Sequence, residues 1–398
     1  MDHAELDELL TPEALELLDS LDTVETVADV ARAVSRLRGA GHSPERVSAV
    51  VGQVRLRQRA EAKFGDFARH MLFTRAGLEQ ATRMSVSAHH AGRFQKAGIG
   101  RVADLGCGIG GDSLAFASLG IGVLAVDADD VTAALAAYNL SPFRDDAGSV
   151  DVRHGRAEET DLAGVDAVWL DPARRTRGHS ETRRVSPDDY SPALDWAFAL
   201  AQRLPTGIKL SPAHDRDAIP DEFEAQWISV DGSTVELVLW SGSLAREGVR
   251  RAALVIRSGG AHEITAPGDA EDEAVRRLGS FVHEPEGSVI RARLVGDVAR
   301  ALEAGPVAEG IAYLTGDAEL TSPFVRTFRV RETLPADPGR LAKALRERDI
   351  GTLEIKKRGV DIDPAALRKK LKLRGSGSAT LLVTRIDGKR VAILADRV

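Results

Sequence analysis

The chain has 398 residues, a net charge of −7 and one cysteine, Cys107. This length is too great for one ordinary core, so we expect two or three domains. A single cysteine excludes an intramolecular disulfide and a cysteine-based zinc site, and it fits a reducing compartment. No apolar run reaches the roughly 18–20 residues that span a bilayer, and the acidic start of the chain does not resemble a signal peptide. We therefore expect a cytoplasmic protein without membrane association.

Residues 1–97 are predicted to be helical, because leucines recur at steps of three and four between Leu6 and Leu21. From residue 98 to 258, short apolar runs alternate with helical stretches. This alternation predicts an α/β domain with a parallel sheet and helices on both of its faces. The predicted strands are 101–105, 122–127, 150–152, 165–170, 207–210, 235–240 and 252–256, the last two as a closing pair. The predicted helices are 112–119, 131–139 and 192–204.

Residues 259–324 are poorly patterned, and their sequence indicates no role. Residues 325–398 predict a small α+β domain with a hairpin over Asp387-Gly388. This last segment carries 19 Lys and Arg against 9 Asp and Glu, although the whole chain is acidic. A basic domain on an acidic body suggests a polyanionic partner, and nucleic acid is the usual one. A merely well-solvated small domain is the alternative.

Residues 104–110 form a glycine-rich turn between the first predicted strand and a helix. Glycine permits positive φ and lets a ligand approach the backbone closely. Asp104 lies inside the strand, where dinucleotide-binding folds usually carry an apolar residue. Asp127 ends the second strand, where it can accept hydrogen bonds from a ribose diol. The alternatives are a nicotinamide-dependent enzyme and a degenerate domain that binds no cofactor.

This segment resembles the cofactor loop of class I S-adenosylmethionine-dependent methyltransferases, and the resemblance covers roughly residues 100–215. It implies a Rossmann-like sheet and the cofactor S-adenosyl-L-methionine. Residues 73–82 are expected to fold over that cofactor. Glu158, after the third strand, occupies a corner that often contacts the adenine amino group, although an exposed helix start explains it nearly as well. The cofactor contacts that the resemblance implies are Asp104, Gly106, Cys107, Gly108, Gly110, Asp127, Ala128 and Glu158.

Asp171-Pro172-Ala173-Arg174 follows the fourth strand, at the sheet edge where open α/β folds bind ligands. It resembles the Asp/Asn-Pro-Pro-x loop of methyltransferases that act on nucleobase nitrogens. An exocyclic amine is a poor nucleophile, because its lone pair is delocalised into the ring. Hydrogen bonds to Asp171 and to a loop carbonyl would orient the amine and disperse its developing charge. A sulfonium donor is already activated, so we expect no metal.

The loop departs from the family pattern at Ala173 and at Arg174, where adenine-N6 enzymes carry an aromatic residue. These departures argue against adenine N6 and leave another base nitrogen open. RNA enzymes that methylate pyrimidine carbon 5 need a cysteine nucleophile. Cys107 lies in the cofactor loop, so that chemistry is excluded. We expect Asp171, Pro172 and Arg174 to be catalytic, and a plain strand-ending turn is the alternative.

Two basic regions suit phosphate recognition, because the guanidinium fork binds two oxygens at once. One follows the Asp171 loop, where ion pairs with the acidic body are the alternative. The other resembles, at residues 356–359 and 371–375, the THUMP-like domain behind the catalytic domain in a family of bacterial methyltransferase homologues. That resemblance implies RNA binding by analogy. The expected RNA contacts are Arg175, Arg177, Lys356, Lys357, Arg358, Lys369, Lys370, Lys372 and Arg374.

The sequence therefore predicts an S-adenosylmethionine-dependent methyltransferase that acts on a base nitrogen of structured RNA. Its expected parts are a helical region (1–97), a methyltransferase domain (98–258), a connecting region (259–324) and a THUMP-like domain (325–398). A small-molecule methyltransferase and a non-catalytic RNA-binding protein on the same scaffold are the alternatives. The sequence carries no indication of the oligomeric state.

Overall fold

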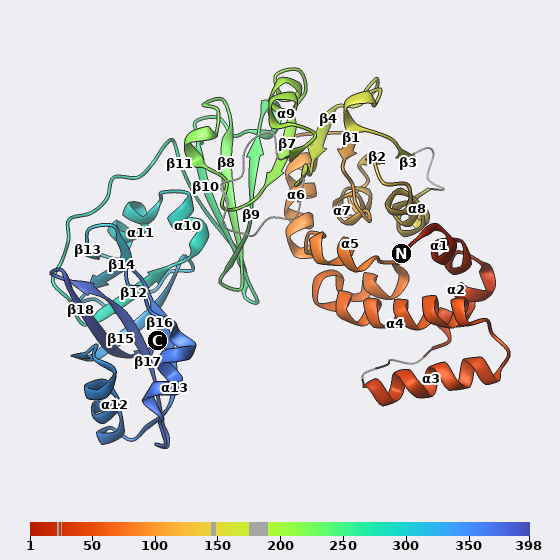
Figure 1. Ribbon diagram of the computed structural model, residues 1–398. Helices are drawn as coiled ribbons and strands as arrows, with labels where there is room; N and C mark the ends of the chain where they lie inside the picture. The colour runs from red at the N-terminus through yellow and green to blue at the C-terminus, as the bar shows by residue number, and fades with distance from the viewer. Residues whose placement is uncertain (22–23, 25, 145–148, 175–189) are drawn as a thin grey trace. The chain divides into compact units, whose positions relative to one another are not determined.

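The structure is a computed structural model that describes residues 1–21, 24, 26–144, 149–174 and 190–398 (Figure 1). The chain divides into two compact units. The first comprises Met1–Leu210 and Leu239–Ala245, and the second comprises Ser211–Val238 and Arg246–Val398.

The N-terminal part of the first unit is helical, as the leucine spacing predicts. Thr11 caps one helix ahead of Pro12, and Ser43 caps another ahead of Pro44, so proline stands where its missing N–H costs nothing. The helices are α1 (His3–Leu9), α2 (Pro12–Asp19), α3 (Val27–Gly39), α4 (Pro44–Phe64), α5 (Arg75–Gln80) and α6 (Met84–Lys96). Within the described ranges, no helix is long and apolar enough to cross a membrane.

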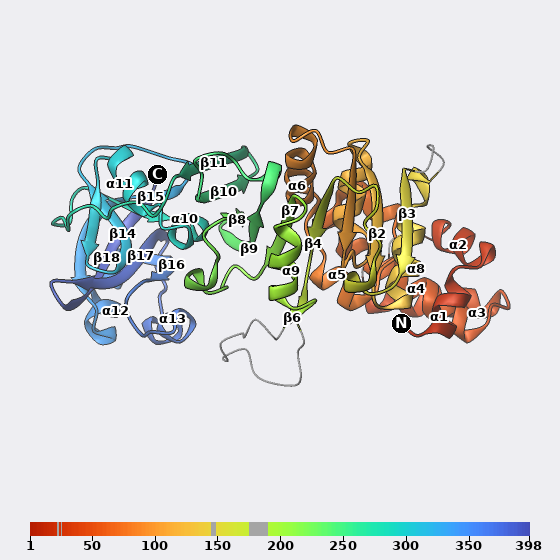
Figure 2. The same cartoon turned by 90° about the horizontal axis from the view of Figure 1, so that it is seen from above.

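A parallel sheet forms the centre of the first unit, with the strand order β3-β2-β1-β4-β7 (Figure 1, and from above in Figure 2). Chain order runs outward from β1 in both directions, so the sheet has a topological switch point between β1 and β4. Ligands of open α/β sheets bind at the carboxyl ends of such strands. The strands are β1 (Arg101–Leu105), β2 (Gly122–Asp127), β3 (Val150–His154), β4 (Ala167–Leu170) and β7 (Thr206–Leu210). The helices that follow β1 are α7 (Gly111–Ser118), α8 (Asp130–Asn139) and α9 (Leu194–Ala201).

Large rings hold β4 in place from within the first unit. Trp169 on β4 is fully buried, and its ring centroid lies 4.3 Å from that of His90 on α6 and 5.8 Å from that of Trp240. Gly207 on β7 makes room for both indoles, because an added Cβ would lie 2.8 Å from each of them. Close packing of this kind fixes the end of β4, from which the Asp171 loop leaves.

In the second unit, β8 (Glu224–Val230) lies between β9 (Ser233–Trp240) and β10 (Arg251–Arg257), and β11 (Gly260–Ala266) pairs with β10. The last two residues of β9 belong to the first unit. The expectation that 235–240 and 252–256 form a closing pair is therefore wrong. The strand β8 is not predicted from the sequence, because its polar residues resemble surface residues but are buried with partners. Glu224 accepts a 2.6 Å hydrogen bond from Arg246, and Gln226 lies against Glu263.

A seven-stranded sheet in the second unit has the order β13-β14-β12-β15-β18-β17-β16. The predicted hairpin over Asp387-Gly388 is confirmed, because Ile386 pairs with Lys389. Residues 259–324 supply β12, β13 and β14 to this sheet, and β12 pairs with β15. The strands are β12 (Phe281–Pro285), β13 (Gly305–Ala308), β14 (Ile311–Gly316), β15 (Val325–Pro335), β16 (Ile350–Lys357), β17 (Gly377–Ile386) and β18 (Lys389–Arg397). The helices are α10 (Gly287–Arg291), α11 (Val295–Ala301), α12 (Pro338–Glu347) and α13 (Pro364–Leu371).

Candidate functional site

The glycine-rich turn after β1 packs against the protein on one side and is open on the other. Gly106 and Gly108 have φ values of 85° and 55°, which glycine adopts without strain. An added Cβ at Gly106 would lie 2.8 Å from the carbonyl oxygen of Asp171. At Gly108 the same position has no described atom within 4 Å. Glycine at position 106 therefore lets the loop after β1 touch the loop after β4, and Gly108 borders open space.

Asp104 is buried beneath this turn with only one carboxylate oxygen satisfied. Its Oδ2 accepts a 2.5 Å hydrogen bond from Ser113 on α7, whereas its Oδ1 is buried without a hydrogen-bond partner among the described residues. Burial, reinforced by the negative charge of Asp112, raises the pKa of Asp104 to about 8. Buried polar atoms normally have a hydrogen-bond partner, so this oxygen is available to a group of a ligand.

Asp112 has the opposite electrostatic environment. Its Oδ1 lies 2.9 Å from His90 Nδ1, and both side chains are buried. Burial raises the pKa of Asp112, but the hydrogen bond and charge of His90 outweigh it and bring the pKa to about 2. At neutral pH the site therefore contains a charged Asp112 beside a largely protonated Asp104.

Asp127 at the end of β2 is oriented by two backbone donors. Its Oδ2 accepts from Gly108 N and its Oδ1 from Asp129 N, each at 2.9 Å. Burial raises its pKa. Ala128 follows as an exposed residue. Glu158 accepts a 3.1 Å hydrogen bond from its neighbour Arg156. Asp127 is thus joined directly to the glycine-rich turn, and Glu158 is paired with a nearby arginine.

Cys107 is buried in the turn, and its backbone N–H donates to Val126 O at 3.0 Å. Burial, together with the negative charges of Asp104 and Asp127, raises the pKa of its thiol well above the usual value. The thiol therefore stays protonated, which disfavours its use as a nucleophile. Across the described ranges, no group of three or more His, Cys, Asp or Glu side chains is arranged to hold a metal ion.

The loop after β4 brings Asp171 to the same edge of the sheet. Its backbone N–H donates to Leu105 O at 3.3 Å. Its Oδ2 accepts a 2.6 Å hydrogen bond from Lys209 Nζ on β7, and Lys209 also donates to Thr82 Oγ1 at 2.9 Å. The Lys209 side chain is 14% exposed and that of Asp171 is 35% exposed, so the carboxylate remains accessible. In the sequence, Lys209 is indicated by its place at the end of a predicted parallel strand, whereas Thr82 is indicated only as the last residue of the segment 73–82 and has no individual role.

The segment before α6 lies beside the glycine-rich turn. Asn139 of α8 binds the backbone N–H and C=O of Leu72 at 2.7 and 3.0 Å, and it donates to Ile109 O at 2.9 Å. Gly77 on α5 leaves room for the Ile109 side chain, because an added Cβ would lie 2.6 Å from it. These contacts place Leu72 and Gly77 beside the glycine-rich turn, and the expectation that residues 73–82 fold over the cofactor stays a prediction.

The remaining predicted residues of the loop are only partly described. Pro172 is buried directly after Asp171. Arg174 lies in β5 (Ala173–Arg174), which pairs with β6 (Tyr190–Ser191). The Arg174 side chain and the predicted RNA contacts Arg175 and Arg177 lie outside the described residues.

The predicted RNA contacts of the second unit fall into two groups. Lys356 is 15% exposed and bonds Glu284 at 2.6 Å, while Arg358 lies over the Tyr313 ring at 5.3 Å. These two residues stabilise the sheet. Lys357 is exposed, and its ammonium donates to Ile362 O at 2.5 Å. The second group is exposed at the end of α13 and comprises Lys369, Lys370, Lys372 and Arg374.

The parallel sheet carries a glycine-rich turn after β1 and an Asp-Pro loop after β4, and this loop contacts the turn. These features define a Rossmann-like methyltransferase domain. Two proteins of Mycobacterium tuberculosis, from strains CDC 1551 / Oshkosh and ATCC 25618 / H37Rv, are each 35% identical to this chain over 342 residues. The match covers 83% of this chain and 90% of theirs, and each is described as an uncharacterized S-adenosylmethionine-dependent methyltransferase. The chain belongs to this family of S-adenosylmethionine-dependent methyltransferases, which confirms the predicted class of enzyme.

Two family models match parts of this chain, and one solved structure shares its fold. Residues 325–397 match the family described as THUMP domain-like, as predicted for the C-terminal segment 325–398, here called the tail. Residues 2–60 match a domain of unknown function. A crystal structure from Porphyromonas gingivalis W83, described as a candidate methyltransferase, is 22% identical with a TM-score of 0.75. The alignment covers 100% of this chain and 99% of that one, so the two proteins share a fold.

Proposed function

We propose that this enzyme transfers the methyl group of S-adenosylmethionine to a nitrogen of a base in structured RNA. The contact between Gly106 and the Asp171 carbonyl carries the proposal. It joins the turn that would hold the methyl donor to the loop that would hold the acceptor. Both loops follow neighbouring parallel strands, so donor and acceptor would meet in one crevice with little freedom to misalign.

The residues around the glycine-rich turn fit the cofactor. The positive charge of the ammonium of the methionine part would favour ionised Asp104. Its unpartnered Oδ1 can then accept a hydrogen bond from that ammonium. Asp127 is fixed by two backbone donors and retains lone pairs for the ribose hydroxyls. The open side of Gly108 admits a ligand against the backbone. When bound, the cofactor supplies a methyl group already activated on a sulfonium sulfur. In this proposal, Gly110, Ala128 and Glu158 complete the contacts.

Asp171 is proposed to orient the base nitrogen. The carboxylate can accept an N–H hydrogen bond from the base and disperse the positive charge that develops as the nitrogen lone pair forms the new N–C bond. The 2.6 Å bond from Lys209, itself held by Thr82, fixes the position of this carboxylate. Pro172 and Arg174 would shape the loop around the base.

The choice of RNA as substrate rests on the tail. Residues 325–397 match a THUMP domain-like family, and the end of α13 presents an exposed group of basic side chains. Phe328 is fully buried, so it is not available for base stacking. These features support recognition of the RNA backbone and shape.

The proposal is tested by an assay that measures transfer of labelled methyl from S-adenosylmethionine to RNA. The substrate is total RNA from a strain that lacks the protein. The variant is Asp171→Asn, and the matched control is Asp7→Asn on the exposed side of α1. We expect label in a discrete RNA species with wild type and control, and at least a hundredfold less with Asp171→Asn. Nucleoside analysis then identifies the base.

Other outcomes separate the alternatives. Label that survives in Asp171→Asn would show that Asp171 does not orient the acceptor. Cofactor binding without any label in RNA would refute the RNA assignment and favour a small-molecule substrate, whose turnover would not fall with added salt as phosphate contacts do. RNA binding without transfer of methyl to any substrate would indicate a non-catalytic RNA-binding protein.

A further inference from the structure

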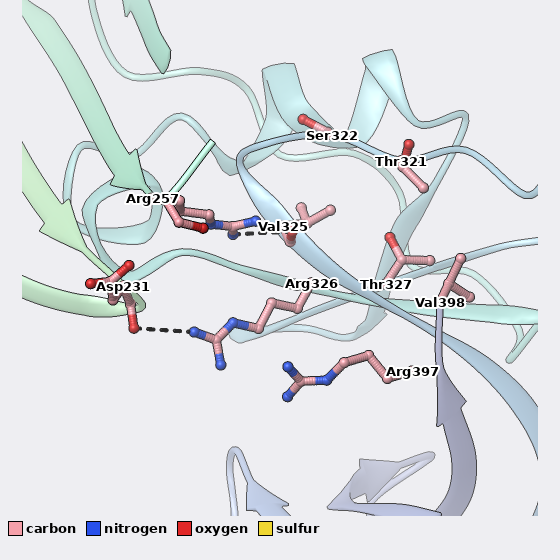
Figure 3. Close-up of a pocket in the computed structure, with 10 residues that line it drawn as sticks. Asp231, Arg257, Thr321, Ser322, Val325, Arg326, Thr327, Arg397 and Val398 are labelled. Carbon is pink, nitrogen blue, oxygen red and sulfur yellow. Dashed lines mark hydrogen bonds between the residues drawn. The ribbon is translucent and has the colours of Figure 1, made fainter. Parts of the chain in front are cut away.

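The second unit contains a polar pocket with a volume of about 440 Å³ (Figure 3). Three arginines line it, together with several hydroxyl groups and one carboxylate. The charged and hydroxyl-bearing lining residues include Arg257, Arg326, Arg397, Thr321, Ser322 and Asp231. Pockets of this size accommodate small ligands.

The arginines converge because three strand ends meet at this point. Arg257 ends β10, Arg326 is the second residue of β15, and Arg397 ends β18. The strands β15 and β18 are antiparallel neighbours. Figure 3 shows the side chains of Arg326 and Arg397 extended in the same direction from these two strands. Residues 325–397 also carry the THUMP domain-like match.

Two acidic side chains that are not among the lining residues pair with two of the arginines. Arg257 donates to Glu286 at 2.5 Å, and the side chain of Glu286 is only 3% exposed. Arg397 donates to both oxygens of Glu354, at 3.1 and 3.0 Å. Each guanidinium has five N–H donors, so one carboxylate partner leaves donors for a ligand.

Arg326 is the least neutralised of the three. In the described part of the chain, its nearest carboxylate oxygen belongs to Glu286, at 3.7 Å from Nε. Its Nη2 donates a long, 3.4 Å hydrogen bond to the backbone carbonyl of Asp231. Gly232 (φ 86°) makes room for this guanidinium, because an added Cβ would collide with it. A cation that is held in place without a close counter-ion favours an anionic ligand.

We propose that this pocket binds a phosphate group of the RNA chain. Phosphate oxygens accept hydrogen bonds from guanidinium and hydroxyl groups. The pocket offers both kinds of donor, from its three arginines and from Thr321 and Ser322. Glu286 and Glu354 offset the charges of Arg257 and Arg397, so Arg326 is the lining arginine whose charge is least offset by a nearby carboxylate. The proposal rests on the proposed function, since it takes RNA as the ligand, and it adds a defined site for the RNA backbone.

The test measures binding of a single-stranded RNA oligonucleotide to the full chain as salt is varied. The variant Arg326→Gln removes one pocket cation. Arg329→Gln is the control, because Arg329 lies on the same strand outside the pocket and is paired with Glu319. The variant Gly232→Asn keeps every charge and displaces the Arg326 guanidinium. Thermal melting of each variant shows that it is folded.

We expect about tenfold weaker binding for Arg326→Gln and for Gly232→Asn, with the control within twofold of wild type. The slope of log K against log salt should fall by about 0.7 for Arg326→Gln, the value for one lost contact to a single strand. Inorganic phosphate should compete with the oligonucleotide on wild type and less on Arg326→Gln.

Equal binding by Arg326→Gln and Arg329→Gln, with RNA still bound by wild type, would overturn the pocket assignment and leave the proposed function intact. If the folded wild-type chain binds neither this oligonucleotide nor a structured RNA, both proposals fail. If inorganic phosphate or a free nucleotide binds the pocket while RNA affinity is unchanged by Arg326→Gln, the ligand is a small phosphorylated molecule and the assignment to RNA is wrong.

Discussion

Asp104→Asn is expected to make the stability of the protein less sensitive to pH. The pKa of Asp104 rises from 3.8 to about 8 on folding. Between these values the native state holds a proton that the unfolded chain releases, so rising pH favours unfolding. For one proton the slope is about 1.4 kcal/mol per pH unit. From pH 5 to pH 7 this effect therefore removes about 3 kcal/mol of unfolding free energy, and asparagine cannot contribute it.

Urea unfolding of the cofactor-free protein between pH 5 and pH 8 measures this effect. Tryptophan fluorescence is a suitable probe, since three of the four tryptophans (Trp169, Trp196 and Trp240) belong to the first unit. All other groups titrate in both proteins, so the difference between them isolates Asp104. The difference should shift by about 3 kcal/mol in favour of Asp104→Asn between pH 5 and pH 7. Parallel curves would refute the conclusion that Asp104 is buried in its protonated form.

Three further predictions concern the site. Gly106→Ala should lower the unfolding free energy by about 2 kcal/mol or more, because positive φ and the contact with the Asp171 carbonyl both oppose a Cβ. Gly108→Ala should lower the unfolding free energy by only about 1 kcal/mol, yet weaken S-adenosylmethionine binding at least tenfold by calorimetry. Equal effects of the two variants on stability and on binding would contradict the assignment of Gly108 to the cofactor side of the turn. Lys209→Met should reduce kcat about ten- to hundredfold with the cofactor Kd within twofold, whereas a parallel loss of cofactor affinity would place Lys209 elsewhere in the mechanism. Gly207→Ala should lower the unfolding free energy of the first unit by about 1–3 kcal/mol, measured by urea unfolding, because the added Cβ would collide with Trp169 and Trp240. An unchanged urea midpoint would show that these two indole rings shift at little energetic cost.

Local sequence patterns were sufficient for the central sheet and for the glycine-rich turn. The spacing of the strands around residues 104–110 and Asp127 is set by a strand–turn–helix unit, which short-range rules describe well. The tail hairpin was predicted for the same reason. By contrast, β8 was missed because Glu224 and Gln226 look like surface residues until Arg246 and Glu263 are brought against them.

Charge alone did not distinguish structural from exposed basic residues. Lys356 and Lys369 belong to clusters of similar composition. Lys356 is held by Glu284 on a distant strand, whereas Lys369 stands free of the core at the end of α13. Which lysine is available to a ligand depends on where the acidic partner lies, and that partner is 72 residues away along the chain.

By itself, then, the sequence determined the class of enzyme, because the cofactor turn is a continuous segment whose geometry is dictated by its own glycines. It also determined the THUMP-like character of the tail. Tertiary structure decided which side chains lie beside Asp171 in the candidate site. Lys209 and Thr82 are 127 positions apart and meet only because a parallel sheet aligns the end of β7 with the segment before α6. The raised pKa of Asp104 and the arginine pocket arise in the same way, because burial and charge proximity are properties of the folded chain.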